Sequence, residues 1–113
     1  METMAAISWA DFEKIEMRVG TITHAEVFRE AKKPAYKIMV DFGPYGIKKS
    51  SAQITRLYQP EALIGKQVIA VLNFPPKQIA NLKSECLILG VVDEADVTLI
   101  GPGKPVANGL RVG

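Results

Sequence analysis

The segment NFPPKQIANLKSECLILG, from Asn73 to Gly90, decides the fold because it joins two apolar strands through a stiff, basic loop. The preceding run QVIAVLNF is nearly continuous in apolar and β-branched residues, which is typical of a strand buried on both faces, and ECLILGVVD is expected to be its partner. Pro75 and Pro76 fix φ and lack amide donors, so the chain must leave the sheet there in an extended path. The loop therefore holds Lys77 in a defined position.

Upstream of this segment, the sequence predicts a short helix followed by three strands. Ser8 is a favourable N-cap for a helix from Trp9 to about Ile15. A long strand from Met17 to Phe28 follows, in which Gly20 indicates a bulge or bend. PAYKIMVDF then alternates as a second strand does, GPYG supplies a turn, and IKKSSAQIT gives the third strand.

The elements that complete the fold are short. Pro60 to Gly65 predicts one or two helical turns between the third and fourth strands, with Pro at the start and Gly at the end. VTLIGP and LRVG, on either side of GPGKP, are expected as closing strands. The pattern predicts an all-β fold, an oligonucleotide-binding (OB) five-stranded barrel with a short N-terminal helix and C-terminal extension strands. The length of 113 residues fits a single domain, 1–113.

The composition of the chain indicates its oligomeric state and its cellular compartment. At 48% hydrophobic residues, a chain this small is expected to cover apolar surface against a second copy, and a homodimer is the default; the alternative is a monomer with an apolar ligand groove. No run approaches the ~20 apolar residues that cross a bilayer, and the N-terminus lacks the pattern typical of a signal peptide, so we expect a cytoplasmic protein without membrane insertion. The single cysteine, Cys86, lies in an apolar run and is expected to be a buried structural thiol.

The net charge of +2 conceals an asymmetry along the chain. Residues 29–56 carry seven basic and two acidic side chains, whereas residues 1–28 carry two basic and five acidic ones, and the remainder balances. A local basic field of this kind attracts a polyanion. The alternative is that the lysines only keep the loops soluble.

Four separated segments carry a family resemblance. NFPPKQIANLKSECLILG, DFEKIEMRVGTI (Asp11 to Ile22), SSAQIT (Ser50 to Thr55) and PEALIGKQV (Pro60 to Val68) together resemble the tRNA-binding domain family, from about Trp9 to Val112. The paired prolines and SECLILG point to its CsaA branch, because synthetase-type members tend to carry NL-x-PRK-x-xG and SxGMxL. The resemblance implies a tRNA-binding homodimer that acts as a molecular chaperone in protein export and binds unfolded or signal-bearing preproteins. The alternative is a tRNA-binding module, synthetase-associated or free-standing, without chaperone activity.

An OB barrel lays its ligand across one face and grips it with loops, so basic loop residues near that face are the candidates for RNA contact. Lys77 and Ser84 match the lysine and serine of the family, but Lys33 stands where synthetase-type members commonly have histidine. We therefore expect salt-sensitive, shape-driven binding. The predicted RNA-binding residues are Lys32, Lys33, Lys37, Lys48, Lys49, Arg56, Asn73, Lys77 and Ser84.

Base stacking is limited by an aromatic content of 7%. Of the candidates Tyr36, Phe42, Tyr45 and Phe74, the two phenylalanines end apolar strands and are expected to pack in the core. Tyr45, in a turn, is the better candidate for stacking. Trp9 is expected to anchor in the core or in a dimer interface.

A chaperone would need an apolar groove for extended polypeptide. The predicted peptide-binding residues are Phe74, Pro75, Pro76, Ile79 and Leu82, and the alternative is ordinary loop packing.

Catalysis is not expected. His24 is the sole histidine and has no neighbouring nucleophile, so neither a hydrolytic triad nor a histidine-rich metal site can be built. GPGKP lacks the spacing of a phosphate loop, and the acidic group at residues 93–96 is expected to be a solvated turn. The sequence thus predicts a protein that is not an enzyme and has no cofactor and no metal.

Overall fold

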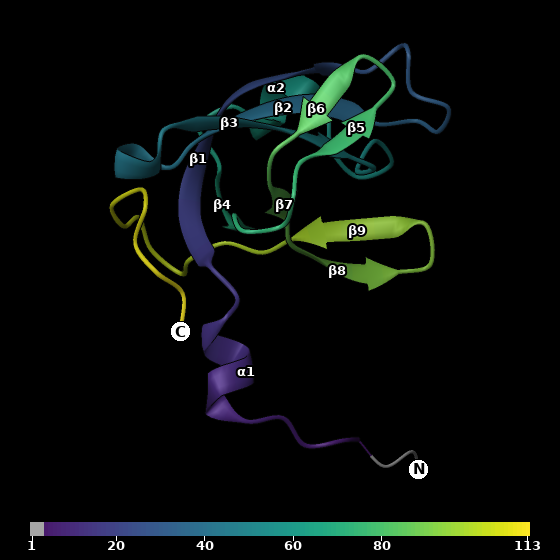
Figure 1. The fold of residues 1–113 in the computed structure, drawn as a ribbon. Helices are drawn as coiled ribbons and strands as arrows, with labels where there is room; N and C mark the ends of the chain where they lie inside the picture. The colour runs from purple at the N-terminus through teal and green to yellow at the C-terminus, as the bar shows by residue number, and fades with distance from the viewer. Residues whose placement is uncertain (1–3) are drawn as a thin grey trace.

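The computed structural model describes residues 4–113, which form a nearly closed antiparallel barrel (Figure 1). Its five-stranded sheet has the order β3-β2-β1-β4-β7. The two outer strands meet through the segment before β7, where Glu85 N donates to Lys49 O at 2.8 Å and Ser50 Oγ donates to Cys86 O at 3.0 Å. The predicted all-β, five-stranded barrel is confirmed. Its strands are β1 (Met17–Val27), β2 (Tyr36–Asp41), β3 (Ile47–Ala52), β4 (Gln67–Val71) and β7 (Leu87–Ile88).

Side chains alternate across the barrel wall as the sequence predicts. Along β2, Tyr36, Ile38 and Val40 are buried while the residues between them are not. Of the bulge or bend expected at Gly20, the bulge is not found there, because the register shift lies between Ile22 and His24. Gly20 instead permits close packing, since a Cβ there would lie 2.5 Å from Val40 Cγ1.

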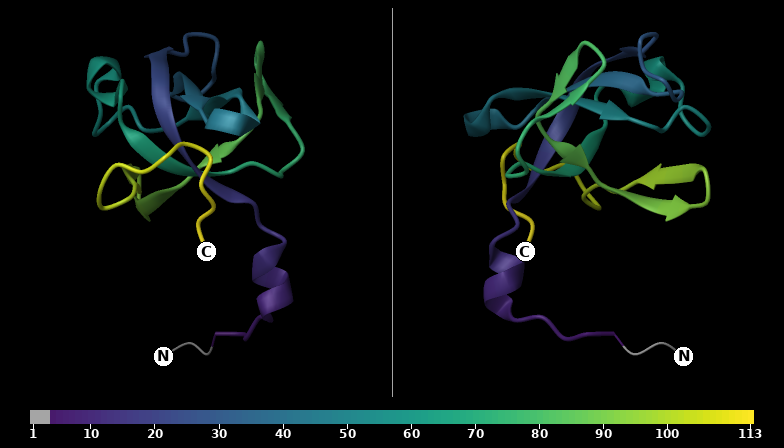
Figure 2. Two further views of the ribbon diagram at one scale, coloured as in Figure 1. Left: turned by 90° about the vertical axis from the view of Figure 1, so that its left-hand side faces the viewer. Right: turned by 45° about the vertical axis from the view of Figure 1, so that its right-hand side comes forward.

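Within residues 4–113, three short helices flank the strands. Helix α1 (Trp9–Glu13) begins at Ser8 in a capping box with Asp11, ends before the predicted Ile15, and projects away from the barrel (Figures 1 and 2). Helix α2 (Pro60–Leu63) and the 3₁₀ helix η1 (Gly43–Tyr45) lie at the predicted helical turn and at the GPYG turn. None of the helices in residues 4–113 is long and apolar enough to cross a membrane.

Two hairpins extend from the barrel. The basic loop contains β5 (Lys77–Ile79) and β6 (Leu82–Ser84), two strands that the sequence did not predict. ECLILGVVD was expected to form one strand, but it forms two. Leu87–Ile88 pairs with β4, whereas β8 (Gly90–Asp93) turns away to pair with β9 (Asp96–Leu99). Figure 2 shows the β8–β9 hairpin standing off the barrel wall.

The C-terminal segment returns to β1. LRVG forms one isolated bridge, Arg18 to Arg111, rather than a regular strand. Further backbone hydrogen bonds join Val19 N to Leu110 O at 3.0 Å and Val112 N to Met17 O at 2.9 Å. The first residues of β1 are therefore paired with residues 110–112.

Candidate nucleic-acid interface

Two loops pack against each other at one end of the barrel and form a single surface. The β1–β2 loop (28–35) and the β5–β6 hairpin (77–84) share a small buried cluster of Phe28, Ala35 and Leu82. Asn81 Nδ2 also donates to Glu30 Oε2 at 3.3 Å. We call this surface the loop face. Because the two loops fix each other, the side chains that they display have a defined arrangement.

The loop face carries unpaired positive charge. Lys32, Lys33 and Lys77 are exposed, and none of them has an ion-pair partner among the described residues. Lys83, on β6, is also exposed and was not among the predicted RNA contacts. Uncompensated cations on a positioned surface attract phosphate groups.

The outer side of β2 and β3 adjoins the loop face through Ser84, whose hydroxyl accepts from Ser51 N at 3.4 Å. Lys49 lies on this side, opposite Met39, and is exposed. Lys48 alternates to the other side of β3 and is half-buried. Only Lys49 of this pair therefore extends the surface of the loop face.

Among residues 4–113, Lys37 is the one predicted lysine that a carboxylate compensates. Its Nζ lies 3.7 Å from Glu30 Oε1 and 5.1 Å from the centre of the Phe28 ring. A hydrogen bond with its own backbone, together with the charge of Lys37, outweighs the opposing effect of desolvation and holds the pKa of Glu30 below its usual value. Glu30 therefore remains a carboxylate and offsets the charge of Lys37.

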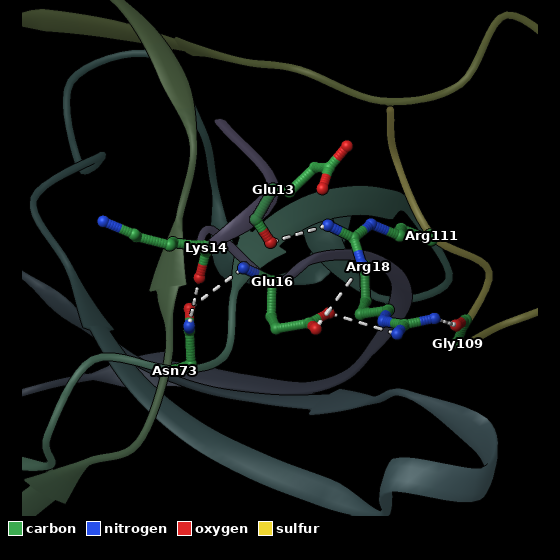
Figure 3. Close-up of polar contacts among 7 residues, drawn as sticks. All are labelled: Glu13, Lys14, Glu16, Arg18, Asn73, Gly109 and Arg111. Carbon is green, nitrogen blue, oxygen red and sulfur yellow. Dashed lines mark hydrogen bonds and ion pairs between the residues drawn. The ribbon is translucent and has the colours of Figure 1, made fainter. Parts of the chain in front are cut away.

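Three other predicted RNA contacts are occupied by bonds within the protein. Arg56 Nε lies 2.6 Å from Asp96 Oδ1 and so ties the segment that follows β3 to the β8–β9 hairpin. Asn73 Nδ2 donates to Lys14 O at 2.6 Å, and Asn73 Oδ1 accepts from Glu16 N at 3.0 Å (Figure 3). Ser84 contributes to barrel closure. These side chains hold elements together, and the structure does not bring them to the loop face as free groups.

Around Asn73, a group of charged side chains joins both terminal segments to the barrel (Figure 3). Glu16 accepts from Arg18 at 3.1 Å and pairs with Arg111 at 3.5 Å. Arg111 also donates to Glu13 O at 3.0 Å, and Arg18 donates to Gly109 O at 3.2 Å. We call these side chains, with Asn73, the terminal cluster.

An apolar groove of about 860 Å³ opens beside the loop face, between the end of β3 and the β8–β9 hairpin. Of the residues predicted to bind peptide, Phe74, Pro75 and Ile79 line this groove. Pro76 does not, and Leu82 is buried in the cluster beneath the loop face. The opposite wall was not predicted, because ECLILGVVD has the pattern of one continuous strand and gives no sign that β8 turns away from β7. This wall is built from Leu87, Val92, Val97 and Leu99.

Cys86 lines the floor of this groove and is buried, as predicted. Burial raises the pKa of its thiol to about 11, and a hydrogen bond with Ser50 opposes the shift. The thiol is therefore neutral near pH 7 and behaves as an apolar wall atom.

The aromatic candidates divide by burial. Phe42 is completely buried, which confirms its core role, but the same expectation for Phe74 is wrong because 57% of its surface is exposed in the groove. Tyr36 is buried, with its hydroxyl donating to Tyr58 O at 2.7 Å. Trp9 is 80% exposed in the single chain, which excludes a place in the core of its own barrel. Tyr45 remains 47% exposed.

A five-stranded barrel with a helix between its third and fourth strands, and with loops that meet beside one sheet face, is an oligonucleotide-binding fold. Residues 17–111 match the family described as "Putative tRNA binding domain". The chain belongs to this tRNA-binding domain family.

Solved structures and a longer relative resemble the chain. The chaperone CsaA of Bacillus anthracis is 49% identical with a TM-score of 0.92, over 96% of this chain and 100% of that one. The CsaA chaperone protein of Picrophilus torridus is 48% identical with a TM-score of 0.89, over the same shares. The methionine–tRNA ligase of Methanococcoides burtonii is 36% identical over 107 residues, which are 94% of this chain but only 16% of the ligase.

Proposed function

We propose that the protein binds tRNA through the loop face and acts, as a homodimer, as a chaperone for preproteins in protein export. RNA binding is supported by a set of lysines that have no ion-pair partner among the described residues and that lie on two loops which pack against each other. Lys32, Lys33, Lys77 and Lys83 would contact phosphates, and Lys49 would extend the contact across β3. Such contacts position a folded RNA without reading its sequence.

The apolar groove beside the loop face supports the proposed chaperone activity. Its walls are mainly apolar, and Phe74 is exposed there, with no cover from the part of the chain that the structure describes. Lys77 lies at its edge, so extended polypeptide and RNA would compete for neighbouring surface. The alternative is a tRNA-binding module, synthetase-associated or free-standing, that leaves the groove unused.

A homodimer is supported by the apolar residues that precede and begin α1. Met4, Ile7 and Trp9 are all largely exposed on a segment that projects from the barrel. A second copy of the chain is the proposed cover for them. We further propose that the protein is cytoplasmic and works by binding alone, without catalysis.

Fluorescence anisotropy of labelled bulk tRNA across a salt series tests the proposal, with an unfolded preprotein added as competitor. We expect binding that weakens steeply with salt and is displaced by the polypeptide. Salt-steep binding that the polypeptide leaves unchanged would favour the tRNA-only alternative. No tRNA binding even at low salt would refute the RNA half, and size-exclusion chromatography with light scattering would test the dimer separately.

A further inference from the structure

We propose that Tyr45, at the end of η1, is a stacking platform for an unpaired nucleobase of the bound RNA. The inference rests on the proposed RNA binding and adds a contact that is aromatic rather than ionic. It places this contact at the opposite end of β2 from the loop face (Figure 1).

The ring of Tyr45 is held from one side by a fixed cation. Arg18 Cζ lies 4.6 Å from the centre of the ring, at cation–π distance. The guanidinium is itself fixed, because it donates to Glu16 Oε2 at 3.1 Å and to Gly109 O at 3.2 Å, and its side chain is only 17% exposed. Arg18 therefore serves the ring as a support rather than as a free phosphate ligand.

The backbone beneath Tyr45 is equally constrained. Gly43 N donates to Asp41 Oδ1 at 2.8 Å, and Gly46 N donates to Gly43 O at 2.9 Å. The C-terminal segment packs against the same turn, since a Cβ on Gly109 would lie 2.9 Å from Pro44 Cδ. A ring that is already ordered loses little conformational entropy when a ligand binds it.

The exposed part of the ring offers an apolar surface with a hydroxyl at its edge. Every nucleobase has a π-face, so stacking on a positioned aromatic ring is tolerant of sequence. Lys49 follows four residues later and adds exposed positive charge near the turn. A nucleotide is a ligand that uses both features together, because it joins an aromatic base to a phosphate.

The distance to the loop face fits one RNA chain. Strand β2 leads from the β1–β2 loop to η1, and its six residues, at about 3.3 Å each, cover roughly 20 Å. Single-stranded RNA of a few nucleotides could thus contact Lys32 or Lys33 with its phosphates and Tyr45 with a base. The proposed ligand is accordingly an unstacked base in a loop or at an end, not a base inside a duplex.

The test compares Tyr45→Ala with Tyr45→Phe in tRNA and oligouridylate binding. Loss of one stacked base should weaken binding by about 5- to 150-fold in Tyr45→Ala, whereas Tyr45→Phe keeps the ring and should bind as the wild type does. The dependence of affinity on salt should be the same in all three proteins, because the phosphate-binding lysines are unchanged. Equal affinity of Tyr45→Ala and wild type would overturn the inference.

A measurement on the unaltered chain guards against a variant that fails to fold. The ring protons of Tyr45 in the wild-type protein should shift upfield in NMR spectra when oligouridylate is added. If the chemical shifts of these ring protons stay unchanged when RNA binding is saturated, the inference is overturned. It is also overturned if Tyr45→Ala changes the oligomeric state but leaves the RNA affinity unchanged. If the wild-type protein binds no RNA at any salt, the proposed function itself fails.

Discussion

The terminal cluster and the loop face are both rich in charge, but they use it in opposite ways. In the terminal cluster, Glu16 lies between Arg18 and Arg111, so that cations and anions offset one another. On the loop face, Lys32, Lys33 and Lys77 have no such partner within the described chain. In this protein, the absence of a partner distinguishes a candidate binding surface from a structural one better than the number of charges does.

The largest expected effect is on RNA affinity at the loop face. The double substitution Lys32→Ala and Lys33→Ala should lower tRNA affinity by on the order of 50-fold at about 0.1 M salt and reduce the log–log salt slope by about 0.9 for each phosphate that the protein no longer neutralises. Anisotropy titrations measure both. The matched control, Lys14→Ala with Arg111→Ala, removes the same amount of positive charge near the terminal cluster, away from the loop face. It should change tRNA affinity by less than about two-fold, because only the screened long-range field of the protein changes. If both double variants bind tRNA equally weakly, net charge alone governs binding.

Asn73 should behave as a residue of the terminal cluster and not as an RNA contact. Asn73→Ala removes hydrogen bonds to Lys14 O and Glu16 N, and we expect the free energy of unfolding to fall by about 1–2 kcal/mol. Urea denaturation measures this change. Asn73→Asp keeps the acceptor for Glu16 N and is the partial control. An unchanged stability combined with weakened tRNA binding would instead support the direct RNA contact that the sequence predicted.

Glu30 is the carboxylate that makes the loop face resemble the terminal cluster. Glu30→Gln should leave Lys37 uncompensated and raise tRNA affinity a few-fold, with a salt slope steeper by up to about 0.9. Glu61→Gln, on α2, makes the same charge change at an exposed position outside the loop face and is the control. No gain relative to Glu61→Gln would mean that Lys37 does not reach the RNA.

The lowered pKa of Glu30 gives the same variant a second readout. Because the folded state favours the carboxylate, Glu30 contributes stability above its unfolded pKa, and this contribution disappears as pH falls through the lowered folded value. As pH falls from neutral to below the lowered folded pKa of Glu30, the free energy of unfolding should therefore decrease less in Glu30→Gln than in the wild type. Parallel acid titrations of the two proteins would contradict this assignment.

The smallest effect is expected from the ion pairs of the terminal cluster. Glu16→Gln weakens the interactions with Arg18 and Arg111 at a partly exposed position, so stability should fall by about 0.2–1 kcal/mol, and by less in high salt. Thermal melts at two salt concentrations measure it. Glu13→Gln is the matched control, because only the backbone oxygen of Glu13 contacts Arg111. A fall above about 2 kcal/mol would mean that the cluster behaves as a buried network.

Local patterns predicted most of the barrel and the position of its basic loops. Alternation in β2 and the apolar run of β4 have physical periods that can be read directly. The β5–β6 hairpin was missed because its strands have three residues each and turn through Ala80, a residue with positive φ that carries no glycine signal. Asn73 and Arg56 were predicted as RNA contacts because their partners are distant in sequence. Asn73 bonds to Glu16, 57 positions away, and Arg56 to Asp96, 40 positions away.

The return of the C-terminal segment to β1 affects how the chain folds during synthesis. Met17 and Val19 receive their partners from residues 110–112, more than ninety positions later. A nascent chain therefore carries an open strand edge until residues 110–112 leave the ribosome, and pairing over this separation also slows folding. Removal of residues 109–113 would make that open edge permanent, and the expected outcome is pairing between chains and aggregation rather than a merely looser barrel.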